Sequence, residues 1–259
     1  MIVTTTERPE PGTIERARRL AAELKCACVP RGRNTLRKLG RLRPDAADGI
    51  LVVGPDTLRF VRGEEPPLFY HPSMGLIRVK RLREGGDDGL VRAADARPGD
   101  TVLDCTAGLG SDSLVLSYAV GESGRVTALE ASDVLHVIVR EGMRVYRSEL
   151  PDVDEAMRRI EHVKTDHLRY LRSLPDRSCD IVYFDPMFTK PVMASASLRP
   201  LRAVAEDAPL SEESVAEARR VARKRIVLKE HRDSGEFERL GFERGRMTDS
   251  SVAYGVIDV

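Results

Sequence analysis

The feature that most constrains the fold is a regular alternation of strand-like and helical runs that begins at residue 97. The alternation predicts an α/β fold with a doubly wound, mostly parallel sheet. Two closing strand-like runs have no helix between them, which predicts a terminal antiparallel pair and a seven-stranded, Rossmann-like sheet. The strand-like runs are 101–104, 125–130, 159–164, 179–184, 225–229, 242–247 and 252–259, and the helical runs are 113–118, 132–146 and 211–222.

The residues before this pattern predict a small α+β domain over 1–66, joined by a connecting segment at 67–96 to the domain at 97–259. Apolar residues recur with a helical period after Thr13, which is the expected N-cap of that helix. A turn around Pro55 between two apolar runs predicts a hairpin.

The connecting segment contains the polar–aromatic sequence Phe-Tyr-His-Pro-Ser-Met, which includes His71. Two interpretations remain open. The segment either closes as a lid, in which case His71 contacts the substrate, or forms an interdomain turn in which His71 is hydrogen-bonded.

Composition excludes several classes of protein. Charged residues make up 32% of the 259 residues, but the net charge is only +1, so overall charge gives no argument for nucleic-acid binding. The four cysteines form no C-x-x-C pair, and we expect reduced thiols and no metal site. No apolar run approaches the ~20 residues of a membrane span, and the N-terminus lacks a signal-peptide apolar region. We therefore expect a cytoplasmic protein without membrane contact.

A glycine-rich turn follows the strand-like run that ends at Asp104. A strand, a glycine-rich turn and a helix place backbone amides at the sheet edge where doubly wound folds bind ligands. The dinucleotide pattern G-x-G-x-x-G is broken because Ser113 occupies its third glycine position. Asp104 and Asp112 would repel a pyrophosphate but suit a ligand with ammonium and sulfonium charges, such as S-adenosylmethionine. The alternative is a tight turn in which Asp112 caps the helix.

Two acidic residues follow the next strands. Glu130 ends the second strand-like run, where a carboxylate can accept hydrogen bonds from both ribose hydroxyls. Asp166, which precedes His167, follows the third run and would lie near an adenine amino group. Capping of the next helix explains Asp166 equally well.

The sequence Asp-Pro-Met-Phe follows the fourth strand-like run. The Asp185 carboxylate and the Pro186 carbonyl are two acceptors that could orient one NH2 group towards a methyl donor. Phe188 could stack on the base that carries this amine. The alternative is a strand-ending turn with Met187 and Phe188 in the core. Lys229, after the fifth run, either reaches the acceptor site or forms an ordinary ion pair.

Two basic clusters would give salt-dependent RNA affinity through phosphate contacts. Solvated helix faces are the alternative interpretation. One cluster consists of Arg31, Arg33, Arg37, Lys38, Arg41 and Arg43, and the other of Arg78, Lys80, Arg81 and Arg83.

These residues together resemble class I S-adenosylmethionine-dependent methyltransferases. More narrowly, they resemble the bacterial group that contains the 16S rRNA guanine-N2 methyltransferase. Two motifs carry the resemblance: a T-A-G-L-G-x-D loop from Thr106 to Asp112, and a D-P-M-F motif from Asp185 to Phe188. The resemblance covers roughly residues 97–259.

The resemblance implies that S-adenosylmethionine is the cofactor and that Asp185, Pro186 and Phe188 form the acceptor site, with Met187, Lys229 and His71 as weaker substrate contacts. The chain departs from the wider amine methyltransferases, which have Asp/Asn-Pro-Pro-Phe/Tyr, because Met187 replaces the second proline. The N-terminal part, where target choice usually resides, does not match the rRNA enzyme. The implied cofactor-binding residues are Asp104, Thr106, Ala107, Gly108, Gly110, Asp112, Glu130, Ala131, Asp166 and His167.

The sequence thus predicts methyl transfer from S-adenosylmethionine to an exocyclic base amine of RNA, without a metal. The favoured target is guanine N2 of 16S rRNA, with small-subunit rRNA or a ribosomal particle as the partner. Two alternatives remain: a methyltransferase that acts on a protein amide or small amine, and a non-catalytic module that binds S-adenosylmethionine.

Overall fold

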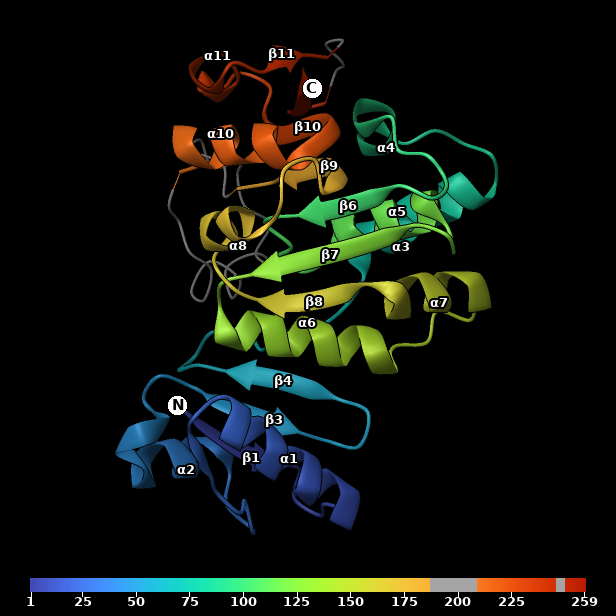
Figure 1. Ribbon diagram of the computed structural model, residues 1–259. Coiled ribbons are helices and arrows are strands. Elements are labelled where there is room, and N and C mark those ends of the chain that lie inside the picture. The colour runs from blue at the N-terminus through green and yellow to red at the C-terminus, as the bar shows by residue number, and fades with distance from the viewer. Residues whose placement is uncertain (187–208, 246–249) are drawn as a thin grey trace. The chain divides into compact units, whose positions relative to one another are not determined.

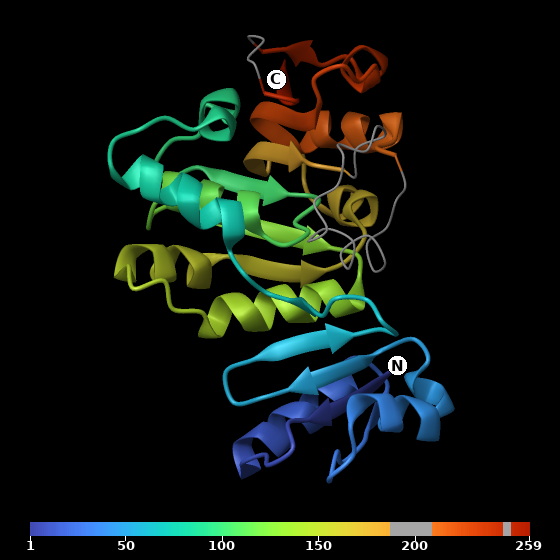
Figure 2. The ribbon, with the colours of Figure 1, turned by 180° about the vertical axis from the view of Figure 1, so that it is seen from behind.

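The computed structural model describes residues 1–186, 209–245 and 250–259 (Figures 1 and 2). These residues divide into two compact units. The N-terminal unit consists of Met1–His71 together with Asp133–Tyr146, and the large-sheet unit contains the other described residues. Within the described ranges, neither unit has a helix with the length and hydropathy that a bilayer span requires.

The N-terminal unit is built on a mixed sheet with the strand order β2-β1-β3-β4-β5. β1 pairs in parallel with β2 and β3, and the expected hairpin joins β3 to β4 in antiparallel register. β1 is buried along its whole length. The strands are β1 (Ile2–Thr5), β2 (Ala27–Cys28), β3 (Ile50–Val53), β4 (Leu58–Val61) and β5 (Leu68–Phe69), and the helices are α1 (Pro11–Glu23), α2 (Leu36–Leu42), the short 3-10 helix η1 (Pro44–Ala46) and α6 (Asp133–Val145).

The predicted N-cap of the first helix is wrong. α1 begins at Pro11, with Glu10 in the N-cap position, so Thr13 is a buried residue of the first turn. Proline favours this start because its missing N–H would have no helical partner in the first turn anyway.

Helix α6 belongs to the N-terminal unit, although it lies within 97–259 along the chain. Its Glu141 is buried and accepts hydrogen bonds from Arg16 and Arg19 of α1. Arg140 on the same helix pairs with Glu23 at the end of α1. These charge-assisted hydrogen bonds join α6 to the first helix of the chain.

The large-sheet unit confirms the predicted doubly wound, mostly parallel sheet. Its seven strands have the order β11-β12-β10-β9-β6-β7-β8. β12 runs antiparallel to both β10 and β11, as the closing pair of strand-like runs predicted. The strands are β6 (Thr101–Asp104), β7 (Arg125–Glu130), β8 (Glu161–Lys164), β9 (Cys179–Phe184), β10 (Ala222–His231), β11 (Glu243–Arg244) and β12 (Val252–Asp258).

The helices of this unit form two groups. α5 packs against α3, α4 and α7, whereas α8 packs against α10. α3 and α4 lie in the segment predicted only to connect two domains, so the sequence analysis missed both helices. The helices are α3 (Ser73–Arg83), α4 (Gly89–Ala94), α5 (Ser111–Val120), α7 (Pro151–Arg159), α8 (His167–Ser173), α10 (Glu212–Val221) and α11 (Glu236–Leu240).

Along the central strands, successive side chains point to opposite faces of the sheet. Leu103, Val182 and Leu228 pack into one core with residues of α8, α10 and α11. Asp104 and Lys229, which directly follow two of these residues in the chain, therefore point to the opposite face, where α5 lies.

Replacing Glu141 with Ala should lower the free energy of unfolding by about 3 kcal/mol, because losing one partner of a buried ion pair leaves the other charge uncompensated. The charge left behind is the buried guanidinium of Arg16. Urea denaturation followed by circular dichroism measures the change, with Glu155→Ala at an exposed position of α7 as the control. Equal unfolding midpoints for the two variants would contradict the role given to Glu141.

Candidate functional site

The loop that follows β6 is fastened to the end of the neighbouring strand β7. The Gly108 amide donates to Oε2 of Glu130 over 3.2 Å, and the Ala107 amide donates to the Leu129 carbonyl over 3.0 Å. The arrowheads of β6, β7 and β8 end at the same edge of the sheet (Figure 1). The loop and Glu130 therefore meet at the carboxyl edge, where doubly wound sheets bind ligands.

Two glycines allow the loop to turn tightly into α5. Gly108 has φ of 53° and Gly110 has φ of 73°, both in the left-handed region that glycine tolerates best. Gly110 is also the N-cap of α5. The helix therefore begins directly at the loop and directs its amino end towards the sheet edge.

Asp104, at the end of β6, stabilises this loop through hydrogen bonds. Its buried carboxylate accepts hydrogen bonds from the Ser113 hydroxyl and, over 3.1 Å, from the Thr106 amide. Burial raises the pKa of Asp104 to about 7, although these two hydrogen bonds oppose the shift. Ser113, which breaks the dinucleotide pattern, thus ties α5 to the end of β6.

Asp112 is the centre of a buried polar network. Its Oδ2 accepts hydrogen bonds from Lys229 Nζ and from the Tyr183 hydroxyl, each over 2.8 Å. Its Oδ1 pairs with Arg78 of α3. Arg78 also forms a two-pronged pair with Asp88, the N-cap of α4, at 2.7 and 2.8 Å. The network therefore links three helices to two central strands.

Lys229 connects Asp112 to Asp185. In the sheet register Leu228 lies beside Phe184, so the next residues on the two strands, Lys229 and Asp185, are also neighbours. Lys229 Nζ lies 2.7 Å from Oδ2 of Asp185. The Asp185 amide donates to the Thr106 hydroxyl in the loop after β6. Asp185 is thus held by β10 on one side and by the glycine-rich loop on the other.

The surroundings shift the pKa values of Asp112 and Asp185 in opposite directions. Burial disfavours ionised Asp112, but Lys229 and Arg78 outweigh it and hold the pKa of this carboxyl well below its usual range. Burial, together with the charge of Asp112, raises the pKa of Asp185 to about 7, and Lys229 opposes this rise. Burial disfavours the charged form of Lys229, but the charges of Asp112 and Asp185 outweigh it and raise the pKa of this side chain.

The other predicted cofactor residues lie close to strand ends. Glu130 also accepts a hydrogen bond from the Ser132 amide over 2.7 Å, next to the partly buried Ala131. Asp166 caps α8 by accepting from the Arg169 amide over 2.8 Å, the role that sequence analysis gave as its alternative.

His167 follows Asp166 at the start of α8. Its Nε2 lies 3.0 Å from the Ser214 hydroxyl, and its ring meets Phe184 edge-on at 5.8 Å. The cofactor contacts of both Asp166 and His167 stay predictions.

The other predicted residues of the acceptor site are His71, Met187 and Phe188. His71 belongs to the N-terminal unit, where its ring meets that of Tyr146 edge-on at 5.8 Å. Met187 and Phe188 lie outside the described residues, and Pro186 is the last residue described before them. Asp185 and Pro186 are therefore the described part of the D-P-M-F motif.

Sequence analysis missed the role of Arg78 and Tyr183 in the site. The prediction that Arg78 contributes to an RNA-contacting cluster is wrong, because its guanidinium is partly buried between Asp88 and Asp112. A signal was present in the motif Asp88-Gly-Leu, since an aspartate before a short apolar run is typical of a helix N-cap. Tyr183 gives no such signal, because a tyrosine within a buried strand usually only packs.

Comparison with known proteins gives the family context. A family model described as "Putative SAM-dependent methyltransferase" matches residues 41–239. The protein YpiP of Bacillus subtilis (strain 168), which is described as uncharacterized, is 40% identical over 256 residues, or 99% of this chain and 98% of that protein. The ribosomal RNA small subunit methyltransferase J of Hydrogenovibrio crunogenus is 30% identical over 58% of this chain, which spans 55% of that relative's length.

A solved structure shares the fold. The SAM-dependent methyltransferase NGO1261 from Neisseria gonorrhoeae superposes with a TM-score of 0.65. The match covers 100% of this chain and 96% of that one at 21% sequence identity.

Replacing Ser113 with Ala should lower the free energy of unfolding by about 1–3 kcal/mol, because the buried carboxyl of Asp104 then loses a donor. Thermal unfolding measures the loss, and Ser123→Ala at an exposed position is the matched control. If both serine variants melted together with the parent protein, Ser113 would not be the link between β6 and α5.

Proposed function

Because the chain belongs to the family of S-adenosylmethionine-dependent methyltransferases, we propose that its methyl acceptor is an exocyclic base amine of RNA. Guanine N2 of 16S rRNA is the favoured acceptor. The observation that carries the proposal is the position of Asp185, which follows β9 and contacts both the glycine-rich loop and Lys229. An amine bound at Asp185 would therefore be next to the loop that serves the cofactor.

The residues present fit S-adenosylmethionine, the cofactor of this family. The carboxylate of Glu130, at the carboxyl edge of the sheet, suits two ribose hydroxyls, and Asp166 suits the adenine amine. Gly108 and Gly110 bring the backbone close without a side chain in the way. When bound, the cofactor supplies a methyl group activated by its sulfonium charge.

Asp185 and Pro186 would orient the acceptor amine. The Asp185 carboxylate accepts one N–H of the amine, and the Pro186 carbonyl accepts the other. This pairing directs the nitrogen lone pair towards the methyl group, so positioning contributes more than base strength. As the new N–C bond forms, the methyl group would leave the cofactor sulfur, which would keep the electron pair of the broken S–C bond, and the ionised carboxylate of Asp185 could accept the proton that the amine must lose. Lys229 acts as a positioning residue, because its ion pair holds Asp185 in place.

Basic residues of the N-terminal unit support an RNA substrate. We define the basic surface as Arg33, Arg37, Lys38 and Arg41, on and just before α2. All four are exposed, and none forms an ion pair with another described residue. The neighbouring Arg31 and Arg43 are instead paired with acids. Unpaired cations at the surface are suited to phosphate contacts. The matched relatives named ribosomal RNA small subunit methyltransferase J support the same substrate class.

Mass spectrometry of 16S rRNA from cells with and without the gene tests the proposed target. Loss of one N2-methylguanosine on deletion, and its return on complementation, is the expected result. Unchanged rRNA, together with methyl transfer to a protein or a small amine, would reject the RNA substrate.

Replacing Asp185 with Ala should lower the rate of methyl transfer at least about 10²-fold, because the acceptor amine loses its orientation. Cofactor affinity should change less than about twofold, since the predicted cofactor residues remain. A labelled-methyl assay on rRNA from the deletion strain measures transfer, and calorimetry measures cofactor binding. Asp233→Ala, at an exposed position, is the control. Full activity of the Asp185 variant would overturn the acceptor assignment.

Replacing Lys229 with Met should move the acid limb of the pH–rate profile to higher pH. Asp185 must be ionised to accept the amine hydrogen, so activity rises with pH through its pKa of about 7. Lys229 lowers that pKa, and its loss therefore raises it. Lys224→Met, at the other end of β10, is the matched control and should leave the profile unchanged. Coincident acid limbs for the two variants would show that Lys229 does not tune Asp185.

A further inference from the structure

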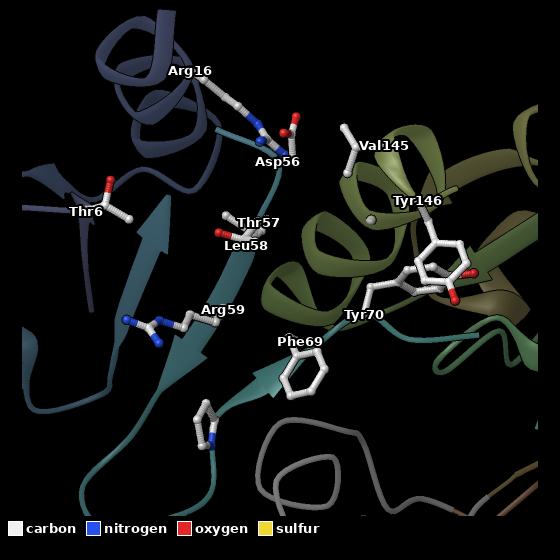
Figure 3. Close-up of a pocket in the computed structure, with 12 residues that line it drawn as sticks. Thr6, Arg16, Asp56, Thr57, Leu58, Arg59, Phe69, Tyr70, Val145 and Tyr146 are labelled. Atoms are coloured by element: carbon white, nitrogen blue, oxygen red, sulfur yellow. The ribbon is translucent and has the colours of Figure 1, made fainter. Parts of the chain in front are cut away.

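The N-terminal unit contains a pocket of about 510 Å³ that the proposed function does not use (Figure 3). Residues of α1, the β3–β4 turn, β4, β5 and α6 line it, so all its described walls belong to one unit. Its size is within the range of ordinary ligand sites, about 300–1,000 Å³.

A buried arginine lies at one end of this pocket. Only 10% of the Arg16 side chain is exposed. Its Nε donates to Glu141 over 3.0 Å, and its Nη1 donates to the backbone carbonyls of Gly54 and Pro55. Its Nη2 is buried and has no hydrogen-bond partner among the described residues. Buried N–H groups in folded proteins are nearly always paired, with protein groups or with ordered water, so this donor calls for an acceptor that the described residues do not supply.

The charge around Arg16 favours an electron-rich ligand. The Glu141 carboxylate is shared among four guanidinium groups, those of Arg16, Arg19, Arg140 and Arg144. Arg59 of β4 lines the same pocket and is exposed, without an ion pair to any described residue. A ligand that brings oxygen acceptors or a negative charge would complement these groups.

Aromatic rings form another wall of the pocket. Phe69, Tyr70 and Tyr146 are drawn on the side away from Arg16 in Figure 3. The rings of Tyr70 and Tyr146 pack edge-on against each other, with their centroids 6.0 Å apart. The Phe69 side chain is 55% exposed, an unusual state for a large apolar residue beside a pocket. An exposed ring of this kind is a stacking surface for a flat ligand.

We propose that this pocket binds one unpaired nucleotide of the RNA substrate, an inference that rests on the proposed function. The base stacks on Phe69, and the oxygen acceptors of the nucleotide meet the exposed guanidinium of Arg59. The carboxylate of Asp56, also in the lining, can accept an N–H of the base. The pocket thereby adds a contact with RNA at a nucleotide other than the one that is methylated.

The central experiment compares RNA binding by the full-length protein and its Phe69 variants. Fluorescence anisotropy measures the affinity for a labelled single-stranded fragment of 16S rRNA. Phe69→Ala should weaken binding about 5- to 150-fold, the usual effect of losing one stacked base. Phe69→Tyr should bind like the parent protein. Ile77→Ala, which removes a similarly exposed apolar side chain from α3, is the control and should have no effect.

A salt titration tests the role of Arg59. Arg59→Gln should reduce the slope of log affinity against log salt concentration by about one, because one phosphate contact is lost. Arg125→Gln, at the exposed amino end of β7, should leave the slope unchanged. Thermal unfolding of each variant verifies that the fold is intact.

The possible outcomes separate this inference from the proposed function. If the parent protein methylates RNA but Phe69→Ala binds it equally well, the pocket inference is overturned and the proposed function stands. If guanosine 5′-monophosphate binds in a Phe69-dependent manner while the RNA fragment does not, the occupant is a free nucleotide and the inference is equally overturned. Absence of both RNA binding and RNA methylation in the parent protein rejects the proposed function itself. A Phe69-dependent loss of RNA affinity, with the controls unchanged, supports the inference.

Discussion

The buried pairing of Asp112 with Arg78 and Lys229 is the interaction on which the rest of the large-sheet unit depends. An isolated carboxylate in this position would be strongly destabilising, because burial removes it from water. Two cations compensate it, and Lys229 in turn pairs with Asp185. Because charges of opposite sign alternate along this chain of contacts, removing any member leaves a neighbouring charge with one partner fewer. Asp185, the proposed acceptor-site residue, is therefore part of the same network that fixes the helices.

Three hydrogen bonds fix the groups at the carboxyl edge of the sheet. Ser113 ties α5 to Asp104, the Gly108 amide ties the loop to Glu130, and Thr106 accepts from the Asp185 amide. The last two of these bonds join the loop after β6 to the ends of β7 and β9, the two strands on either side of β6 in the sheet. The result is a preorganised edge, in which the groups that would receive cofactor and acceptor are held before either arrives.

Much of this arrangement could be predicted from the sequence, because strand ends and glycine-rich turns are local signals. The alternating pattern predicted the seven-stranded sheet, and the strand ends predicted that Asp104, Glu130 and Asp185 would follow neighbouring strands. The partners of Arg78 could not be predicted in this way. The two carboxylates that pair with Arg78 are those of Asp88 at the start of α4 and Asp112 in α5. Only the packing of α3 and α4 on α5 brings these groups together.

The sequence did not reveal the start of α1 or the two helices of the connecting segment, and the reason is a different one. In α1, Pro11 at the first helical position overrode the more obvious cap at Thr13. α3 has basic residues in its last turns and only two buried residues, Gly75 and Val79, so its apolar stripe is too short to recognise. Such helices are stabilised by tertiary contacts more than by their own pattern.

The ion pairs between α1 and α6 have a consequence for how this chain can vary among relatives. Glu141 lies in the middle of the sequence, yet its partners Arg16 and Arg19 lie near the beginning. A substitution at Glu141 would be tolerated only with compensating changes at these two arginines. The first helix of the chain and α6 are therefore constrained to change together. We expect the two distant stretches to co-vary as a single inherited unit.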